Sequence, residues 1–563
     1  MIRKIPHSPL EKIALSCSGG GYRAASFHLG AMAYLNKIQY KGKPLLENVK
    51  LISTVSGGTI TGVVYALKKQ EGKSFEEFYH FLLGKLRTLD LIKLSLVKLS
   101  PEGGLKNQGK RKNLINAFAE LYDEHFTEGA MFEVFDTMKS HLEVVVFNST
   151  EFDNGVNFRF RNKGTGYFGN NYIRVNGAAA AEVKLADAMA ASACFPGGFE
   201  PILWPNDFVH DTSLNLLEKM NKESHVTGLM DGGVYDNQGI QSILLHKKNE
   251  ETPAFDLIII SDVASPYMQP FKPFSEKPKK GLRSLTLNDL QEKTEKIDKG
   301  INMFLLLATV LFLAIPFLWK YAFTFYTGLS LGVALTGMIL MLVKRKIVSY
   351  VKEVVHYVRE QVAELIPAFF RAKLAALRIE HVSVHRIEPL LFDRLNSLVT
   401  LLMDVFLKVV RRLNYGDLYN DEKFMYRRMS NLIKELTKVD FERRANQGRP
   451  ETKDSKKYAA NSKLNGTYDI VVGSKIQKLV EEAASFGTTL WFTDDNELDK
   501  TLDKLLATGR VTMCYNLLDY LEQLLFVEDN GFDQLDQHTQ EALRKTYDEC
   551  LKDWNDFKQS PMG

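Results

Sequence analysis

Cysteine is scarce in this chain of 563 residues, and no two cysteines stand in a C-x-x-C spacing. Widely separated cysteines favour a reducing compartment and exclude a disulfide framework. The first residues, Met1–Ser8, also lack the apolar core of a signal peptide. We therefore expect the main folded part of the chain to stay in the cytosol. The four cysteines are Cys17, Cys194, Cys514 and Cys550.

An excess of charge of either sign is missing as well. Lys and Arg number 72 against 68 Asp and Glu, a formal net charge of +4, which is too small to indicate a nucleic-acid partner. The zinc signature H-E-x-x-H is absent, and the histidine pair His381 and His385 has no third ligand beside it in the sequence. We expect no metal and no cofactor.

What the chain does have is three glycine-rich turns, each directly after a predicted strand. Together they offer the parts of an acyl-transfer site: backbone N–H donors, a hydroxyl and a carboxylate. No single turn establishes this chemistry, because each motif is common by itself. The strand and turn pairs are Lys12–Cys17 with Ser18–Arg23, Lys50–Ser53 with Thr54–Gly58, and Val226–Met230 with Asp231–Gly233.

Ser56 is the candidate nucleophile. It stands between a predicted strand and a predicted helix, Thr59–Leu67, with Gly57 and Gly58 after it, and a nucleophile elbow requires this order. The pattern G-x-S-x-G is incomplete, because Thr54 occupies the position of its first glycine. The alternative is a Ser-Gly-Gly loop without chemistry.

The triple glycine Gly19, Gly20 and Gly21 is the candidate oxyanion hole, since small residues at a helix N-terminus leave N–H groups free for an anion. Arg23 either steadies this loop or attracts an anionic lipid head group. The stretch also fits the dinucleotide pattern G-x-G-x-x-A. We reject that alternative because no acidic residue occurs between positions 24 and 46, where the ribose contact belongs.

Asp231 is the candidate base, at a strand end and before two glycines. The alternative is an ordinary Asp-Gly turn, and Asp236 and Asp262 are the next carboxylates to consider. No histidine stands in a position typical of a base. The sequence therefore favours a Ser–Asp dyad over a triad.

These motifs, in this order, resemble the patatin-like phospholipases over residues 10–265. The resemblance implies a three-layer α/β/α catalytic domain and acyl-ester hydrolysis by Ser56 and Asp231, with the glycine loop as oxyanion hole. Thr54 is the main departure. A weaker likeness at residues 483–492 and 505–509 predicts that the domain resumes after an insertion. Further matches are Phe147–Glu151 with Phe158–Phe160, Ala190–Phe199, and Asp231–Gly239.

The insertion contains two long uncharged runs, Met303–Trp319 and Tyr321–Val343, separated only by Lys320. Their lengths suit two crossings of a hydrocarbon core about 30 Å thick. Lysines crowd both flanks, which predicts that both ends are cytoplasmic and that Lys320 lies at the outer turn. The alternative is a buried helical hairpin of a soluble core. A G-x-x-x-G motif, Gly328 and Gly332, serves packing within the chain or between protomers.

We therefore predict a membrane-anchored serine hydrolase that cleaves ester bonds of membrane phospholipids. It is expected in the bacterial inner membrane, through two helices, with its catalytic domain facing the cytoplasm. Two other functions stay open: a membrane scaffold or sensor with a degenerate domain, and an acyl thioesterase or acyltransferase. The predicted divisions are a catalytic domain (1–265), a basic linker (266–300), a transmembrane hairpin (301–344), amphipathic helices (345–440), a polar loop (441–470) and a helical C-terminal part (471–563).

Overall fold

The computed structural model contains two compact units. In the sequence, the second unit is inserted between the two parts of the first. The first unit comprises Met1–Met268 and Asp404–Gly563, and the second comprises Gln269–Met403. The described residues are 5–562 except 108, 163–167, 176, 211–225, 247–252, 265–286, 319–327, 347–348, 350–383 and 448–458. The predicted outer turn at Lys320 and the pair His381 and His385 lie outside the described residues.

The first unit is built on a mixed sheet in the order β12-β11-β1-β4-β5-β6-β7-β8, with β10 pairing β5 and β9. The strands from β12 to β5 run parallel, whereas β6 to β10 add antiparallel pairs. A separate pair, β2 (Gln39–Tyr40) and β3 (Lys43–Pro44), lies outside this sheet. The sheet strands are β1 (Ile13–Cys17), β4 (Val49–Val55), β5 (Val144–Glu151), β6 (Val156–Arg161), β7 (Phe168–Gly169), β8 (Arg174–Val175), β9 (Ile202–Trp204), β10 (Thr227–Asp231), β11 (Leu257–Asp262) and β12 (Arg428–Leu432).

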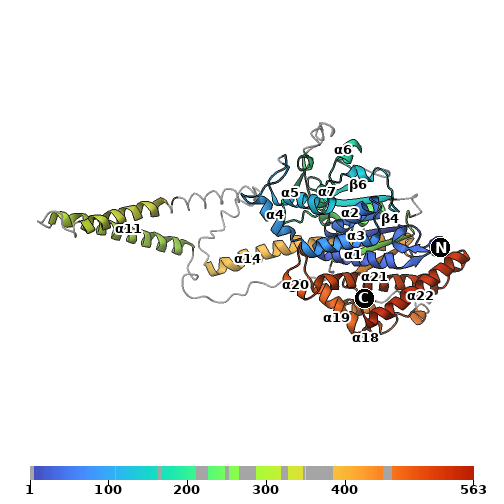
Figure 1. The fold of residues 1–563 in the computed structure, drawn as a ribbon. Helices are drawn as coiled ribbons and strands as arrows, with labels where there is room; N and C mark the ends of the chain where they lie inside the picture. The colour runs from blue at the N-terminus through green and yellow to red at the C-terminus, as the bar shows by residue number, and fades with distance from the viewer. Residues whose placement is uncertain are drawn as a thin grey trace. The chain divides into compact units, whose positions relative to one another are not determined.

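The central strands are buried along almost their whole length because helices cover both faces of the sheet. Alternate residues of β1 belong to different cores: Ile13 and Leu15 join the large one, and Ala14 joins the smaller one. The period of two residues in a strand produces this division. The expected α/β fold is confirmed, and Figure 1 shows its helices around the sheet.

Helices from both ends of the chain cover the large core. α1 (Gly21–Lys37) packs along α21 (Thr501–Phe526) through reciprocal glycines. A Cβ at Gly30 would lie 2.1 Å from the carbonyl oxygen of Leu506, and one at Gly509 would lie 2.2 Å from that of Phe27. The C-terminal helices therefore belong to the same core as the glycine loop.

The other α-helices of the first unit complete its two outer layers. α10 and α15 contribute to the smaller core, and most of the others cover the larger one. They are α2 (Gly57–Gln70), α3 (Phe75–Thr88), α4 (Leu91–Leu99), α5 (Leu114–Tyr122), α6 (Gly177–Ala181), α7 (Leu185–Ser192), α9 (Gly233–Asp236), α10 (Ile240–Leu244), α15 (Leu407–Tyr419), α16 (Lys438–Gln447), α18 (Tyr468–Val471), α19 (Ser474–Ser485), α20 (Asp494–Leu498) and α22 (Gln537–Gln559).

The second unit contains α11 (Leu287–Leu318), a helix over Gly328–Lys346, and α14 (Val384–Thr400). The first two lie antiparallel: Lys344 Nζ donates to Asn302 Oδ1 at 3.2 Å, and a Cβ at Gly337 would lie 3.1 Å from Thr309 Oγ1. Among the described residues, one helix, Gly328–Lys346, is long and apolar enough to cross a membrane, and Lys299–Ala314 is a shorter apolar stretch.

The reciprocal glycine contact predicts a specific loss of stability. Gly30→Ala is expected to lower the free energy of unfolding by about 1–3 kcal/mol, because the new Cβ has no room beside the Leu506 carbonyl and the helices must separate. Thermal or urea unfolding measures this. The matched control is Gly84→Ala in α3, where nothing lies within 4 Å. There, the better helix propensity of alanine should leave stability equal or slightly higher. Equal stabilities for both variants would contradict the close contact.

Candidate active site

Ser56 occupies a strained turn between β4 and α2. Its φ of 51° and ψ of −123° are unusual for a residue with a side chain, and such values recur at nucleophile elbows. The two glycines after it have no space for a Cβ. At Gly57 it would lie 2.1 Å from the oxygen of Gly21, and at Gly58 it would lie 2.4 Å from that of Cys17. The turn thus rests directly on the backbone of the glycine loop.

Thr54 departs from the elbow pattern, and a glycine on the facing helix makes room for its side chain. A Cβ at Gly62 in α2 would lie 2.4 Å from Thr54 Cγ2, so the missing Cβ on the helix leaves room for the side chain on the strand. The Thr54 hydroxyl also shares a hydrogen bond with the Thr59 hydroxyl at 3.0 Å. Close packing of strand and helix is therefore retained with threonine at this position.

Asp231 ends β10 and is 3% exposed. Its carboxylate accepts a hydrogen bond from the N–H of Gly233 at 2.7 Å. Burial raises the pKa of Asp231 to about 6, although the nearby Ser56 hydroxyl and the Gly233 N–H act in the opposite direction. The structure thus brings Ser56 and Asp231 together, and it gives the carboxyl an affinity for protons suited to a base near neutral pH.

The glycine loop lies against Ser56. A Cβ at Gly19 would lie 2.9 Å from Ser56 Cβ, and α1 begins two residues later. Gly19, expected as one of three donors, uses its N–H on the carbonyl of Asn237 at 3.1 Å. Within the described part of the chain, the N–H groups of Gly20 and Gly21 have no hydrogen-bond acceptor. Two of the three expected donors are therefore free.

Arg23 contacts a C-terminal segment. Its Nη1 donates to the carbonyl of Phe486 at 2.8 Å, and the N–H of Tyr22 donates to that of Thr489 at 2.7 Å. A Cβ at Gly21 would lie 2.3 Å from the same Thr489 oxygen. Of the two expectations for Arg23, this geometry favours steadying of the loop.

The alternative carboxylates are engaged elsewhere. Asp236 accepts N–H groups from Gln238, Gly239 and Gln241, and although burial raises its pKa to about 6, its oxygens hold the turn before α10. Asp262 bonds the Arg411 guanidinium at 2.8 Å and the Tyr415 hydroxyl at 3.1 Å.

His28 is the histidine of the first helix after the glycine loop. It is buried between Ser261 Oγ and the carbonyl of Ser18, at 2.8 and 2.9 Å, and burial lowers its pKa to about 4. Its ring nitrogens are thus occupied, and it is not placed as a base.

Residues 15–244 match a family model described as Patatin-like phospholipase. This part of the chain is a patatin-like phospholipase domain. The matched family is one of lipid acyl hydrolases. A search of the curated proteins finds no match.

Two solved structures share low similarity with the chain. Human GIVD cytosolic phospholipase A2 is 12% identical with a TM-score of 0.28, over 46% of this chain and 43% of that one. The human enzyme in complex with methyl gamma-linolenyl fluorophosphonate and terbium chloride is 14% identical with a TM-score of 0.26, over 46% and 41%. The chain thus spans less than half the length of either neighbour.

Sequence reasoning missed two groups beside Ser56 and Asp231. Ser192, at the end of α7, accepts the N–H of Ser56 through its hydroxyl at 2.9 Å. The Tyr122 hydroxyl of α5 is buried without a partner among the described residues, and burial together with the charge of Asp231 raises its pKa. Ser192 lies in the alanine-rich stretch that the sequence singled out, whereas nothing in the sequence marked Tyr122.

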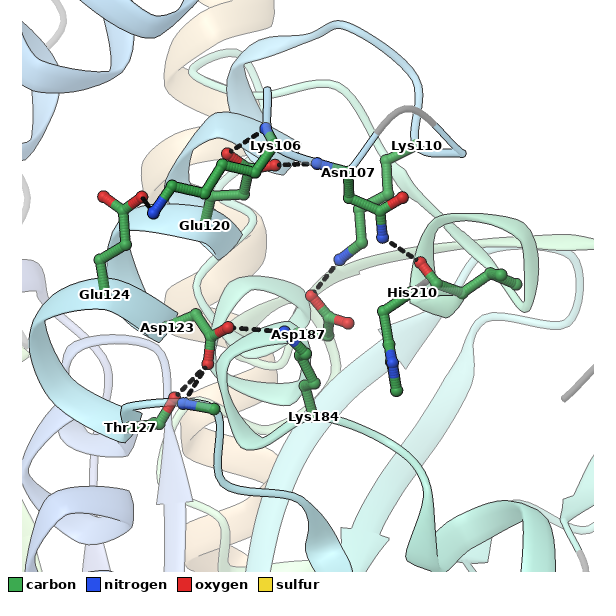
Figure 2. Close-up of polar contacts among 12 residues, drawn as sticks. Lys106, Asn107, Lys110, Glu120, Asp123, Glu124, Thr127, Lys184, Asp187 and His210 are labelled. Atoms are coloured by element: carbon green, nitrogen blue, oxygen red, sulfur yellow. Dashed lines mark hydrogen bonds and ion pairs between the residues drawn. The ribbon is translucent and has the colours of Figure 1, made fainter. Parts of the chain in front are cut away.

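Two lysines before α5 are paired within the patatin-like domain (Figure 2). Lys106 pairs with Glu124 at 2.8 Å, and Lys110 pairs with the buried Asp187 of α7. These residues line a cavity of about 420 Å³ together with Asp123 and Lys184, which form an ion pair at 2.7 Å. The contacts hold the loop before α5 onto α5 and α7.

The buried Asp231 predicts a dependence of stability on pH. Its pKa rises from 3.8 to about 6 on folding, so between these values the folded state retains a proton that the unfolded state has lost. Stability should therefore fall as pH rises through this range, by about 3 kcal/mol in total for this group between pH values well below 4 and well above 6. Asp231→Asn should lack this component. Urea unfolding of both proteins at pH 4.5 and 7.5 measures the difference, and a pH-independent difference would contradict it.

Proposed function

We propose that this chain is a membrane-anchored hydrolase that cleaves ester bonds of phospholipids with Ser56 as nucleophile and Asp231 as base. One observation carries the proposal: Ser56, on its strained turn, lies beside a buried carboxylate whose pKa is raised to about 6 by burial and lowered in part by the Ser56 hydroxyl. At neutral pH that carboxylate is ionised and ready to accept the hydroxyl proton. A dyad therefore requires no histidine, in keeping with the engaged position of His28.

The first half of the reaction forms an acyl-enzyme. Ser56 Oγ attacks the ester carbonyl while its proton passes to Asp231, and the carbonyl oxygen becomes an oxyanion. The free N–H groups of Gly20 and Gly21, at the positive end of the α1 dipole, stabilise this charge. The protonated Asp231 then gives its proton to the departing alcohol oxygen, which leaves the acyl group on Ser56.

The second half releases the acid. Asp231, ionised again, takes a proton from water as the water oxygen attacks the acyl carbonyl. The same N–H groups stabilise the second oxyanion, and Ser56 regains its proton from Asp231 when the carboxylic acid leaves. The carboxyl must lose its proton after each transfer, and a pKa near 6 allows this at neutral pH.

The helical pair of the second unit supports a membrane anchor. Between the two helices lie small or hydroxyl side chains, Thr309, Ser330 and Ala334, which are 6%, 3% and 1% exposed. Large apolar side chains point outward, with Phe304 72% and Leu342 60% exposed. Helices that associate in lipid place small residues between them and apolar residues outside.

The dyad predicts a large loss of activity in two variants. Ser56→Ala should reduce release of labelled fatty acid from phosphatidylcholine–phosphatidylglycerol vesicles by at least about 10³-fold, because no nucleophile remains. Asp231→Asn should reduce it by about 10²–10⁴-fold, because the amide accepts no proton. Asp499→Asn, at an exposed position, is the matched control and should retain full activity.

The same assay separates the alternatives. Activity that persists in Ser56→Ala contradicts the mechanism. A wild-type protein without activity on any ester favours the scaffold or sensor, and activity on soluble acyl thioesters alone favours the thioesterase or acyltransferase.

The hairpin predicts a defined topology. The added cysteine in Lys320→Cys should react with a membrane-impermeant maleimide in intact cells, since the basic flanks hold both ends inside. The four native cysteines are buried, so background labelling of these cysteines should be low. Lys552→Cys, at an exposed position of α22, should react only after permeabilisation. Recovery of the protein in the soluble fraction, or equal labelling of both cysteines in intact cells, would contradict the anchor.

A further inference from the structure

The last residue of α7, Ser192, lies between the two halves of the proposed dyad. It is fully buried. Its hydroxyl oxygen accepts the backbone N–H of Ser56 at 2.9 Å and shares a hydrogen bond with the Thr59 hydroxyl at 2.8 Å. Because Thr59 also bonds Thr54, the strained turn is held by a chain of three hydroxyl groups.

The backbone at the end of α7 contacts the other half of the dyad. The carbonyl of Ser192 accepts the N–H of Gly232 at 3.3 Å, and the carbonyl of Cys194 accepts that of Asp231 at 2.8 Å. Ser192 therefore contacts both the nucleophile turn and the strand end that carries the base, and Cys194 contacts that strand end as well. Displacement of this segment would change the distance between the Ser56 hydroxyl and the Asp231 carboxylate.

The backbone N–H of Ser56 needs a hydrogen-bond acceptor, which Ser192 provides. Pairing of β4 with β5 ends at Val55, so the N–H of Ser56 lies beyond the sheet ladder. A buried N–H without an acceptor is costly, and here it belongs to a residue in an unfavourable conformation. The Ser192 hydroxyl satisfies this N–H and holds the turn in the geometry that directs the Ser56 side chain.

We infer that Ser192 is a positioning residue of the active site, which aligns the Ser56 hydroxyl with Asp231 through the backbone of the nucleophile turn. The inference rests on the proposed function. It also gives a role to Thr54, the residue that departs from the elbow pattern, since its hydroxyl ends the chain that orients Ser192.

The pH profile separates positioning from simple stabilisation. The Ser56 hydroxyl lowers the pKa of Asp231, so a misaligned Ser56 should raise that pKa. The acid limb of the activity profile, which follows ionisation of the base, should then move to higher pH. The other titratable groups facing Asp231 are Tyr122 of α5 and Cys194 after α7, and both stay unchanged in the variants below.

The experiment measures kcat and KM of the full-length protein on a p-nitrophenyl ester in detergent micelles between pH 5 and 9. Ser192→Ala should lower kcat by about 10- to 100-fold with little change in KM, as expected for an unsatisfied buried N–H, and should shift the acid limb upward. Ser95→Ala in α4 removes an equally buried serine hydroxyl that bonds only its own helix, at Ile92. This matched control should keep the wild-type kcat and acid limb.

A second variant covers the case in which Ser192→Ala does not fold. Thr59→Val keeps the side-chain shape and removes the hydroxyl that orients Ser192, and it should lower kcat by about threefold to tenfold. If both are folded, their effects should be non-additive in the double variant.

The inference is overturned if folded Ser192→Ala behaves like Ser95→Ala, or, failing that variant, if Thr59→Val keeps the wild-type kcat and acid limb. Ser56→Ala in the same assay tests the proposed function separately. If Ser56→Ala is inactive and Ser192→Ala is fully active, only the role of Ser192 fails. If Ser56→Ala is active, the dyad itself fails.

Discussion

The candidate site depends on direct backbone contact between two turns. A Cβ at Gly57 would lie only 2.1 Å from the oxygen of Gly21, so the nucleophile turn and the glycine loop approach as closely as their main chains allow. This contact places Ser56 beside the N-terminus of α1, where free N–H groups and the helix dipole favour a negative charge. A side chain at Gly57 or Gly58 would push the nucleophile turn away from the backbone of the glycine loop.

The site uses burial to adjust chemistry at a cost in stability. Removing the Asp231 carboxylate from water raises its pKa to about 6, which suits a base but disfavours the folded state at neutral pH. The left-handed φ of Ser56 is a second unfavourable feature. Hydrogen bonds from the end of α7 offset both unfavourable features, the buried carboxylate and the strained turn, since they satisfy backbone groups of Ser56, Asp231 and Gly232.

The first unit is formed by two stretches of chain with the second unit between them. α21 approaches α1 through Gly30 and Gly509, and the segment around Thr489 contacts the first turn of α1. The N-terminal part therefore lacks a complete core without the C-terminal helices. In the second unit, apolar side chains are exposed and small ones lie between two helices, which is the reverse of a water-soluble helical pair.

The sequence by itself determined the α/β class and the patatin-like motifs, because glycines after apolar strands mark turns where no side chain fits. It also selected Ser56 and Asp231, and the Ser56 hydroxyl lies close enough to Asp231 to lower the pKa of that carboxyl. Only the tertiary structure decided that the Gly19 N–H is occupied by Asn237, that Gly62 makes room for Thr54, and that Ser192 holds the N–H of Ser56. These contacts join residues from separate elements of the fold. Their distances depend on how the elements pack, and local sequence patterns do not determine that packing.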